Sequence, residues 1–173
     1  MKSFIHAALA ACNRADDCSG MQHVFLVDIH LKGVFPKGRV EVLVDTETGV
    51  SVSECLSLNR FLNSAFETSE EMKRLVGDEF EITVSSPGIG EPIKHVRQYI
   101  RHVGHLLRVQ YTDDGQAVQE VLGRLLRAEV LETPCPYIDL VPVTTGKGNN
   151  TVHHEPIRIE LDGIERAVVE VEF

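Results

Sequence analysis

The side chains whose chemistry stands out are basic residues in a segment that has no acids. Residues 92–112 contain no aspartate or glutamate, although the chain as a whole carries a net charge of −9. Lysine and arginine are the side chains that most often contact nucleic-acid phosphates. The segment is therefore a candidate phosphate-binding surface, with an ordinary solvated face as the alternative. Its candidate residues are Lys94, Arg97, Arg101 and Arg108.

Acidic side chains dominate the first half of the chain. Residues 1–91 carry 8 basic and 14 acidic side chains, whereas residues 92–173 carry 9 and 12. A sheet face with acids on it repels phosphate and attracts a basic protein, because complementary charge speeds encounter and fixes orientation. We expect such a face to contact a Lys/Arg-rich protein through four residues: Asp28, Glu41, Glu79 and Glu81.

No catalytic or metal-binding pattern is recognisable. Ser85 and Ser86 precede Pro87, but no general base is identifiable for either hydroxyl, so a role in the turn is favoured over nucleophilic catalysis. The histidines at 95, 102 and 105 lack the i, i+4 spacing that places two imidazoles on one helix face. The four cysteines have no short paired spacing. The sequence therefore predicts no enzyme activity, no metal and no cofactor.

Hydrophobic periodicity predicts the elements of the first half. An alanine-rich stretch up to about Ala15 favours a helix. It also resembles a short signal peptide, but His6 interrupts its apolar run, so we expect the helix of a cytoplasmic protein. Alternation predicts strands over residues 24–31 and 40–44, joined as a hairpin. In the first strand it places on one face Phe25, Val27, Ile29 and Leu31.

A capping box marks the next helix. In Ser51-x-x-Glu54 the hydroxyl can accept the Glu54 amide while the carboxylate reaches back. The helix has an apolar face made of Cys55, Leu58, Leu62 and Phe66. A short helical turn near residues 69–75 and a strand over 80–85 follow. Because each strand has one apolar face, we expect an α+β domain with a three-stranded sheet and two helices on one face.

The last strand of the first half ends abruptly. Proline presets φ at the second position of a turn and a following glycine can take positive φ, so we predict a type II turn at Pro87–Gly88. Gly90 and Pro92 delay any regular element. We therefore expect two domains, residues 1–91 and 92–173, whose junction carries Ser85, Ser86, Pro87 and Gly88.

The second half begins with a predicted helix over residues 95–103. Its apolar stripe is Val96, Ile100 and Val103, and its basic stripe is Lys94, Arg97 and Arg101. Only short strands follow, predicted over residues 106–111, 118–131, 137–143, 152–161 and 166–173, with turns at 113–115 and 146–150. Five short strands suit a small β-barrel, because closure removes the edges of such a sheet.

Three motifs occur in order along the chain: Asp45-x-x-x-Gly-Val-Ser-Val-x-x-Cys55, Val84-Ser-Ser-Pro-Gly-Ile89, and Ile159-Glu-Leu-Asp-Gly-Ile-Glu-Arg-Ala167 with Phe173 last. They resemble the signatures of the ribosome maturation factor RimP family, over residues 40–173. The family usually has Asp-Arg before the proline at 92, where this chain has Gly90-Glu91, so no role of that arginine is carried over. The resemblance implies an SH3-like or Sm-like barrel in the second half.

The resemblance also implies a function. We expect a non-enzymatic, cytoplasmic, monomeric assembly factor that binds the free small (30S) ribosomal subunit, with the basic segment on rRNA and the acidic face on a basic ribosomal protein. A peptide- or protein-binding adaptor that uses the barrel is the alternative, although three tyrosines scarcely supply an aromatic groove. The same shortage argues against sequence-specific reading of bases on a stacking platform. An unrecognised enzyme is a third possibility, disfavoured by the missing catalytic pattern.

Overall fold

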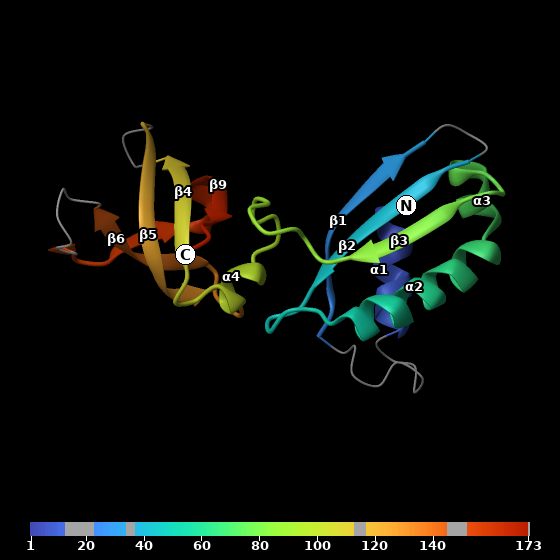
Figure 1. Cartoon of the computed structure of the whole chain (residues 1–173), viewed down its shortest axis with the longest axis horizontal. Coiled ribbons are helices and arrows are strands. Elements are labelled where there is room, and N and C mark those ends of the chain that lie inside the picture. Colours follow the sequence, from blue (N-terminus) through green and yellow to red (C-terminus); the bar gives the residue numbers. More distant parts are fainter. Residues whose placement is uncertain (13–22, 34–36, 113–116, 145–151, 173) are drawn as a thin grey trace. The chain divides into compact units, whose positions relative to one another are not determined.

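The computed structural model describes residues 1–12, 23–33, 37–112, 117–144 and 152–172 (Figure 1). The chain forms two compact units, Met1–Pro87 and Gly88–Phe173, and each has a core of its own. The predicted turns at 113–115 and 146–150, and the predicted helix end near residue 15, lie outside the described residues. That residues 1–91 and 92–173 fold independently stays a prediction.

The first unit is a three-stranded sheet with helices. β1 pairs antiparallel with β2, and β2 pairs parallel with β3. The predicted order of helix, strand, strand, helix and strand is confirmed, and α3 corresponds to the predicted short helical turn. The bounds are α1 Lys2–Cys12, β1 Phe25–Lys32, β2 Arg39–Asp45, α2 Val52–Glu67, α3 Glu70–Val76 and β3 Glu81–Ser85.

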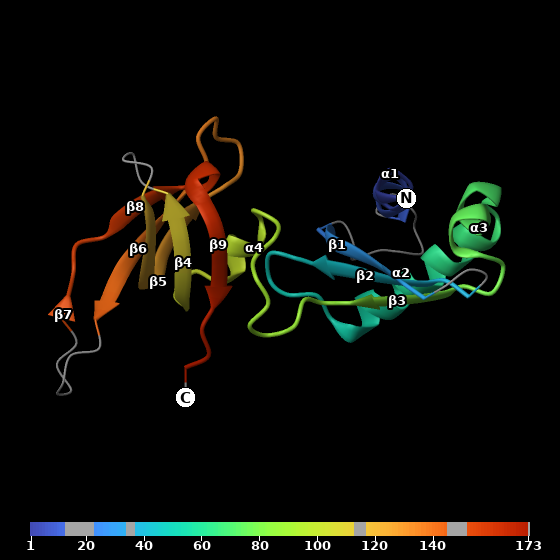
Figure 2. The ribbon, with the colours of Figure 1, turned by 90° about the horizontal axis from the view of Figure 1, so that it is seen from above.

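One face of this sheet carries the core. Val40, Val42 and Val44 alternate along β2 and are fully buried. They share a single apolar cluster with residues of all three helices, among them Ile5, Leu9, Leu58, Leu62, Phe66, Met72 and Val76. The helices therefore pack on this face, as the periodicity predicts, and Figure 2 shows α1 and α3 on the same side of the sheet.

The predicted capping box opens α2. The Ser51 hydroxyl accepts the Glu54 N–H at 3.2 Å, and the Glu54 carboxylate accepts the Ser51 N–H at 2.7 Å. Both donors would otherwise lack an intrahelical partner. The predicted apolar face is buried at Leu58, Leu62 and Phe66. Ser51 and Glu54 therefore cap the helix, and the three apolar residues pack it against the core.

A β-bulge changes the pattern of β1, and the prediction of one face for its alternate apolar residues is wrong. Leu26 pairs with Val44 and Ile29 with Val42, and the register shifts after Leu26. Directly opposite residues share a face, so Leu26 and Ile29 both face the core, with Val27 as the extra residue between them. The alternation of residues within one strand cannot reveal a bulge, because the shift is defined by the pairing with β2.

The turn after β3 also differs from the prediction of a type II turn at Pro87–Gly88, which is wrong. Gly88 does not have a positive φ, whereas Gly90 has a φ of 84°. The Glu91 N–H donates to the Gly88 carbonyl at 3.2 Å, which puts Gly90 at the third position of the turn, where a type II turn requires positive φ. Two glycines could have met that requirement, and the second one does.

The second unit is an antiparallel sheet preceded by one short helix. The strand order is β7-β6-β5-β4-β9, and β8 pairs with β6. Figures 1 and 2 both show β4 between β5 and β9. The predicted strand over residues 152–161 is divided into two. The bounds are α4 Gln98–Arg101, β4 Leu106–Thr112, β5 Val118–Glu129, β6 Tyr137–Thr144, β7 Val152–His153, β8 Ile157–Glu160 and β9 Ile164–Val169.

This sheet is not closed. Its pairings run from β9 through β4, β5 and β6 to β8, and no ladder joins β8 to β9 among the described strands. The α+β class is confirmed, but an SH3-like or Sm-like barrel is not. The core lies on one face of the sheet, where Leu107, Val109, Leu125, Ile138 and Leu140 are fully buried.

The stability of the first unit should depend on Gly38. A Cβ there would lie 2.3 Å from the Val76 carbonyl oxygen and 2.9 Å from Val76 Cβ. Gly38→Ala should therefore lower the free energy of unfolding by about 1–3 kcal/mol, as overpacking does, measured by urea denaturation. Gly88→Ala is the control, because its Cβ would meet only Glu91 Cγ, at 3.7 Å. Equal stability of the two variants would contradict this packing.

Candidate functional site

The predicted basic helix is much shorter than expected. α4 spans only Gln98–Arg101, not residues 95–103. The turns around it are closed by bonds between residues three apart, such as His102 N–H to the Tyr99 carbonyl at 3.0 Å. Such 3₁₀ geometry does not keep residues four apart on one face. The predicted apolar stripe is therefore wrong: Val96 and Val103 are 41% and 44% exposed.

The residues that α4 buries are Gln98 and Tyr99, which are only 3% and 5% exposed. The Gln98 side-chain oxygen accepts the backbone N–H groups of Lys94 and His95, each at 3.0 Å. The Ile93 N–H donates to the Ala167 carbonyl at 2.8 Å, which ties the same segment to β9. The basic segment is thus fixed to the second sheet by its backbone.

The sequence did contain a signal for Gln98. His95 lies three residues before it, and the imidazole Nδ1 accepts the Arg97 N–H at 3.2 Å. The Gln98 side chain reaches back to the His95 N–H. The Gln98 side chain thus makes the half of a capping box in which a Gln reaches back three residues, whereas the His95 imidazole accepts from Arg97 and not from Gln98.

Of the four predicted phosphate-binding residues, Lys94, Arg97 and Arg101 lie in α4 or just before it, and Arg108 lies on the next strand. Lys94 is exposed, and Arg97 and Arg101 are half-buried. Arg108 lies on β4, where its Nε donates to a Glu170 oxygen at 2.7 Å and its Nη1 to a Glu120 oxygen at 3.0 Å. The hydrogen bonds that Arg108 donates to Glu170 and, to a lesser extent, to Glu120 raise its pKa. Its charge is already engaged within its own sheet.

The predicted acidic face is a ladder of ion pairs. Asp28, Glu41 and Glu81 lie on the face of the first sheet that the helices leave open, and Glu79 precedes β3. The Lys32 ammonium, and then His30, lowers the pKa of Glu41 by hydrogen bonding. Each acid has a basic neighbour: Asp28–His30 at 3.1 Å, Glu41–Lys32 at 2.9 Å, Glu79–Lys37 at 3.0 Å and Glu81–Arg39 at 2.8 Å.

The junction residues lie at the end of β3 and in the chain that leads to the next turn. Ser85 ends β3 opposite Leu43, and residues 86–88 continue into the turn that ends at Glu91.

Within the described part of the chain, no three His, Cys, Asp or Glu side chains form a group that could hold a metal ion. None of the helices described there is long and apolar enough to cross a membrane.

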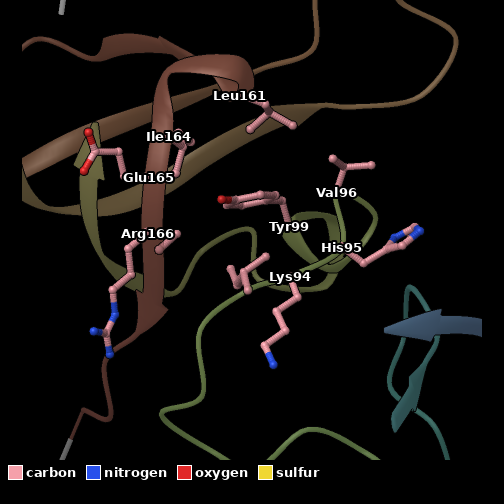
Figure 3. Close-up of a pocket in the computed structure, with 10 residues that line it drawn as sticks. Lys94, His95, Val96, Tyr99, Leu161, Ile164, Glu165 and Arg166 are labelled. Carbon is pink, nitrogen blue, oxygen red and sulfur yellow. The ribbon is translucent and has the colours of Figure 1, made fainter. Parts of the chain in front are cut away.

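A cavity lies beside the basic segment. It has a volume of 150 Å³ and is bounded by the segment that leads into α4 and by β9. Figure 3 shows the Tyr99 ring extending across it, with Lys94 on one wall and Arg166 on the other. The charge pattern of residues 92–112 points to Lys94 but not to Arg166, because β9 is distant along the chain.

Comparison with known proteins agrees with the motifs. A model of the RimP N-terminal domain matches residues 16–90. The ribosome maturation factor RimP of Prosthecochloris aestuarii is 41% identical over 172 residues, which cover 99% of this chain and 96% of that protein. The protein of the same name in Chlorobium limicola is 40% identical over 150 residues, 87% and 85% of the two chains. That of Flavobacterium psychrophilum is 24% identical over 151 residues, 87% and 88%. With such similarity along nearly its whole length, the chain belongs to the ribosome maturation factor RimP family.

Proposed function

We propose that this protein is a non-enzymatic assembly factor that binds the free small (30S) ribosomal subunit and assists its maturation, acting as a monomer in the cytoplasm. One observation carries the proposal: a relative that is 41% identical over 99% of this chain is named a ribosome maturation factor. The arrangement of charge supports it and suggests which surface meets which component of the subunit.

The basic segment is assigned to rRNA. Lys94, Arg97 and Arg101 project from a stretch of backbone that Gln98 and the Ile93–Ala167 hydrogen bond hold in place. Cations on a fixed backbone contact phosphate with little loss of entropy on binding. At Arg108, a phosphate would have to compete with Glu120 and Glu170 for the guanidinium.

The open face of the first sheet is assigned to a basic ribosomal protein. Its contact residues are Asp28, Glu41, Glu79 and Glu81. Their present partners are half-exposed or exposed side chains, and surface ion pairs of this kind contribute at most about 1 kcal/mol each. The lysines and arginines of a partner can therefore replace Lys32, Lys37 and Arg39 at small cost.

We also infer that the second unit is a small SH3-like barrel with one open seam. The pairings form one continuous path from β9 to β8, and a 3₁₀ turn over Leu161–Gly163 connects these two strands directly. The sheet would close into a barrel if β8 and β9 also paired with each other.

An adaptor that grips peptides with aromatic side chains is less well supported. Tyr99 is buried, and the Arg158 guanidinium lies 3.7 Å from the centre of the Tyr137 ring. The Tyr99 ring is therefore covered and one face of the Tyr137 ring is occupied, whereas aromatic peptide-binding grooves depend on exposed rings.

Subunit binding is tested by sedimentation of a cell lysate through a sucrose gradient. The protein should migrate with free small subunits and be absent from whole ribosomes, because an assembly factor leaves when maturation ends. Migration at the top of the gradient, or with whole ribosomes, would contradict the proposed function.

Charge reversal tests the basic segment. Lys94→Glu, Arg97→Glu and Arg101→Glu together should weaken binding to purified small subunits and flatten its salt dependence. The slope of log K against log salt should fall by roughly 0.7–0.9 for each phosphate that the variant no longer neutralises. The matched control reverses Arg60, Lys73 and Arg74 on the helices of the first unit. If the slope falls equally in both triple variants, the segment has no special role.

The acidic face is tested with the basic ribosomal proteins of the small subunit in the absence of RNA. Glu41→Lys with Glu81→Lys should reduce binding of the full chain to its protein partner, and raised salt should weaken the wild-type complex. Glu129→Lys with Glu165→Lys, in the second unit, is the control with the same change of charge. Undiminished binding by the first pair would remove this face from the proposal.

A further inference from the structure

Aliphatic side chains form half of the lining of the cavity beside α4, and polar, charged and aromatic side chains form the other half. The aliphatic residues are Ile93, Val96, Leu161, Ile164 and Ala167. A cavity of about 150 Å³ is large enough for one molecule of benzene, so the volume of this open pocket matches one six-membered ring. All its lining residues belong to the second unit.

A hydrogen-bond donor inside this cavity has no acceptor among the residues that the structure describes. Tyr99 is 5% exposed, and its ring extends from α4 toward β9 (Figure 3). Burial alone raises the pKa of Tyr99, so its hydroxyl stays protonated and able to donate. Buried phenol hydroxyls usually have a partner. The cavity therefore offers a donor to an incoming acceptor.

Positive charge lies at the rim of the cavity and not at its floor. Lys94 and Arg166 extend in the same direction from opposite walls (Figure 3). The Glu165 carboxylate extends the other way (Figure 3) and accepts a hydrogen bond from the Thr112 hydroxyl at 3.0 Å. Because a charged phosphate enclosed by aliphatic walls would lose its hydration, an anionic group fits at the rim, and a neutral ring fits inside.

We propose that this cavity binds one unpaired pyrimidine base of RNA. A base carbonyl accepts from the Tyr99 hydroxyl, and the phosphate of the same nucleotide lies between Lys94 and Arg166. Proteins that bind single-stranded RNA commonly bind bases that are splayed out of a helix. The inference rests on the proposed function, which assigns rRNA to this segment, and adds a base in a pocket to the phosphate contacts. The pocket takes the place of the stacking platform that the sequence lacks.

The site is already formed without a ligand. Gln98 fixes the backbone at Lys94 and His95, and the Ile93 N–H is bonded to the Ala167 carbonyl on the opposite wall. Both walls are therefore held at a fixed separation. A pocket with this preorganisation binds a base without first ordering a loop.

The test measures binding of the full-length protein to fluorescein-labelled hexauridylate by anisotropy, with an abasic ribose-phosphate chain of the same length for comparison. Hexauridylate should bind more tightly than the abasic chain. Tyr99→Phe removes only the hydroxyl and should weaken hexauridylate binding by about 2- to 13-fold, the equivalent of one net hydrogen bond of about 0.5–1.5 kcal/mol. It should leave binding of the abasic chain unchanged. Equal affinity of wild type for both chains would overturn the proposal.

A second pair of variants guards against loss of folding. Val96→Trp should fill the cavity from its exposed edge and abolish the preference for hexauridylate. Val103→Trp, which is equally exposed and does not line the cavity, should preserve it. Thermal unfolding of both variants should match wild type. If both keep the preference, the base binds elsewhere and the proposal is wrong.

Sedimentation separates this inference from the function it rests on. Wild type that migrates with small subunits but does not distinguish hexauridylate from the abasic chain retains the proposed function and refutes the base site. If Tyr99→Phe weakens binding to an isolated ribosomal protein and leaves hexauridylate binding intact, the occupant is a protein side chain, which also refutes it. Wild type that does not migrate with small subunits refutes the proposed function itself.

Discussion

A buried amide oxygen determines how the basic segment is presented. The Gln98 side-chain oxygen accepts hydrogen bonds from the backbone N–H groups of Lys94 and His95, at the start of this segment. Without this acceptor both N–H groups would need water or a new backbone conformation. The chain that leads into α4 also runs antiparallel beside β9. It is held there by the Ile93–Ala167 hydrogen bond and by an isolated β-bridge between Pro92 and Val168. The cations around α4 and the wall of the cavity depend on these few bonds, because a four-residue helix has almost no stability of its own.

Local patterns in the sequence predicted local structure well. The capping box at Ser51 and the buried face of α2 depend on residues three and four apart, so the sequence contains all the information. Alternation along β2 was equally reliable. The bulge in β1 was missed, because register depends on the partner strand. The short length of α4 was missed for a related reason. The spacing of its apolar residues suggested a long helix, but packing on the second sheet buries Gln98 and Tyr99 instead of those residues.

The candidate site was predictable in sign of charge and not in its partners. The sequence shows that residues 92–112 lack acids, and this is sufficient to single out Lys94, Arg97 and Arg101. It does not show that β9 brings Arg166 to the same cavity, or that Glu120 and Glu170 engage Arg108. On the first sheet, Lys32 and Arg39 share a face with Glu41 and Glu81 because strand periodicity places them there. That pairing was readable from the sequence once the hairpin was recognised.

The central claim is that the segment around α4, and not the open face of the first sheet, contacts rRNA. Ultraviolet crosslinking of the full-length protein to free small subunits, followed by mass spectrometry of the crosslinked peptides, tests it most directly. We expect rRNA nucleotides on peptides that contain residues 93–103. Nucleotides found instead on peptides from β1, β2 and β3, with none on residues 93–103, would contradict it.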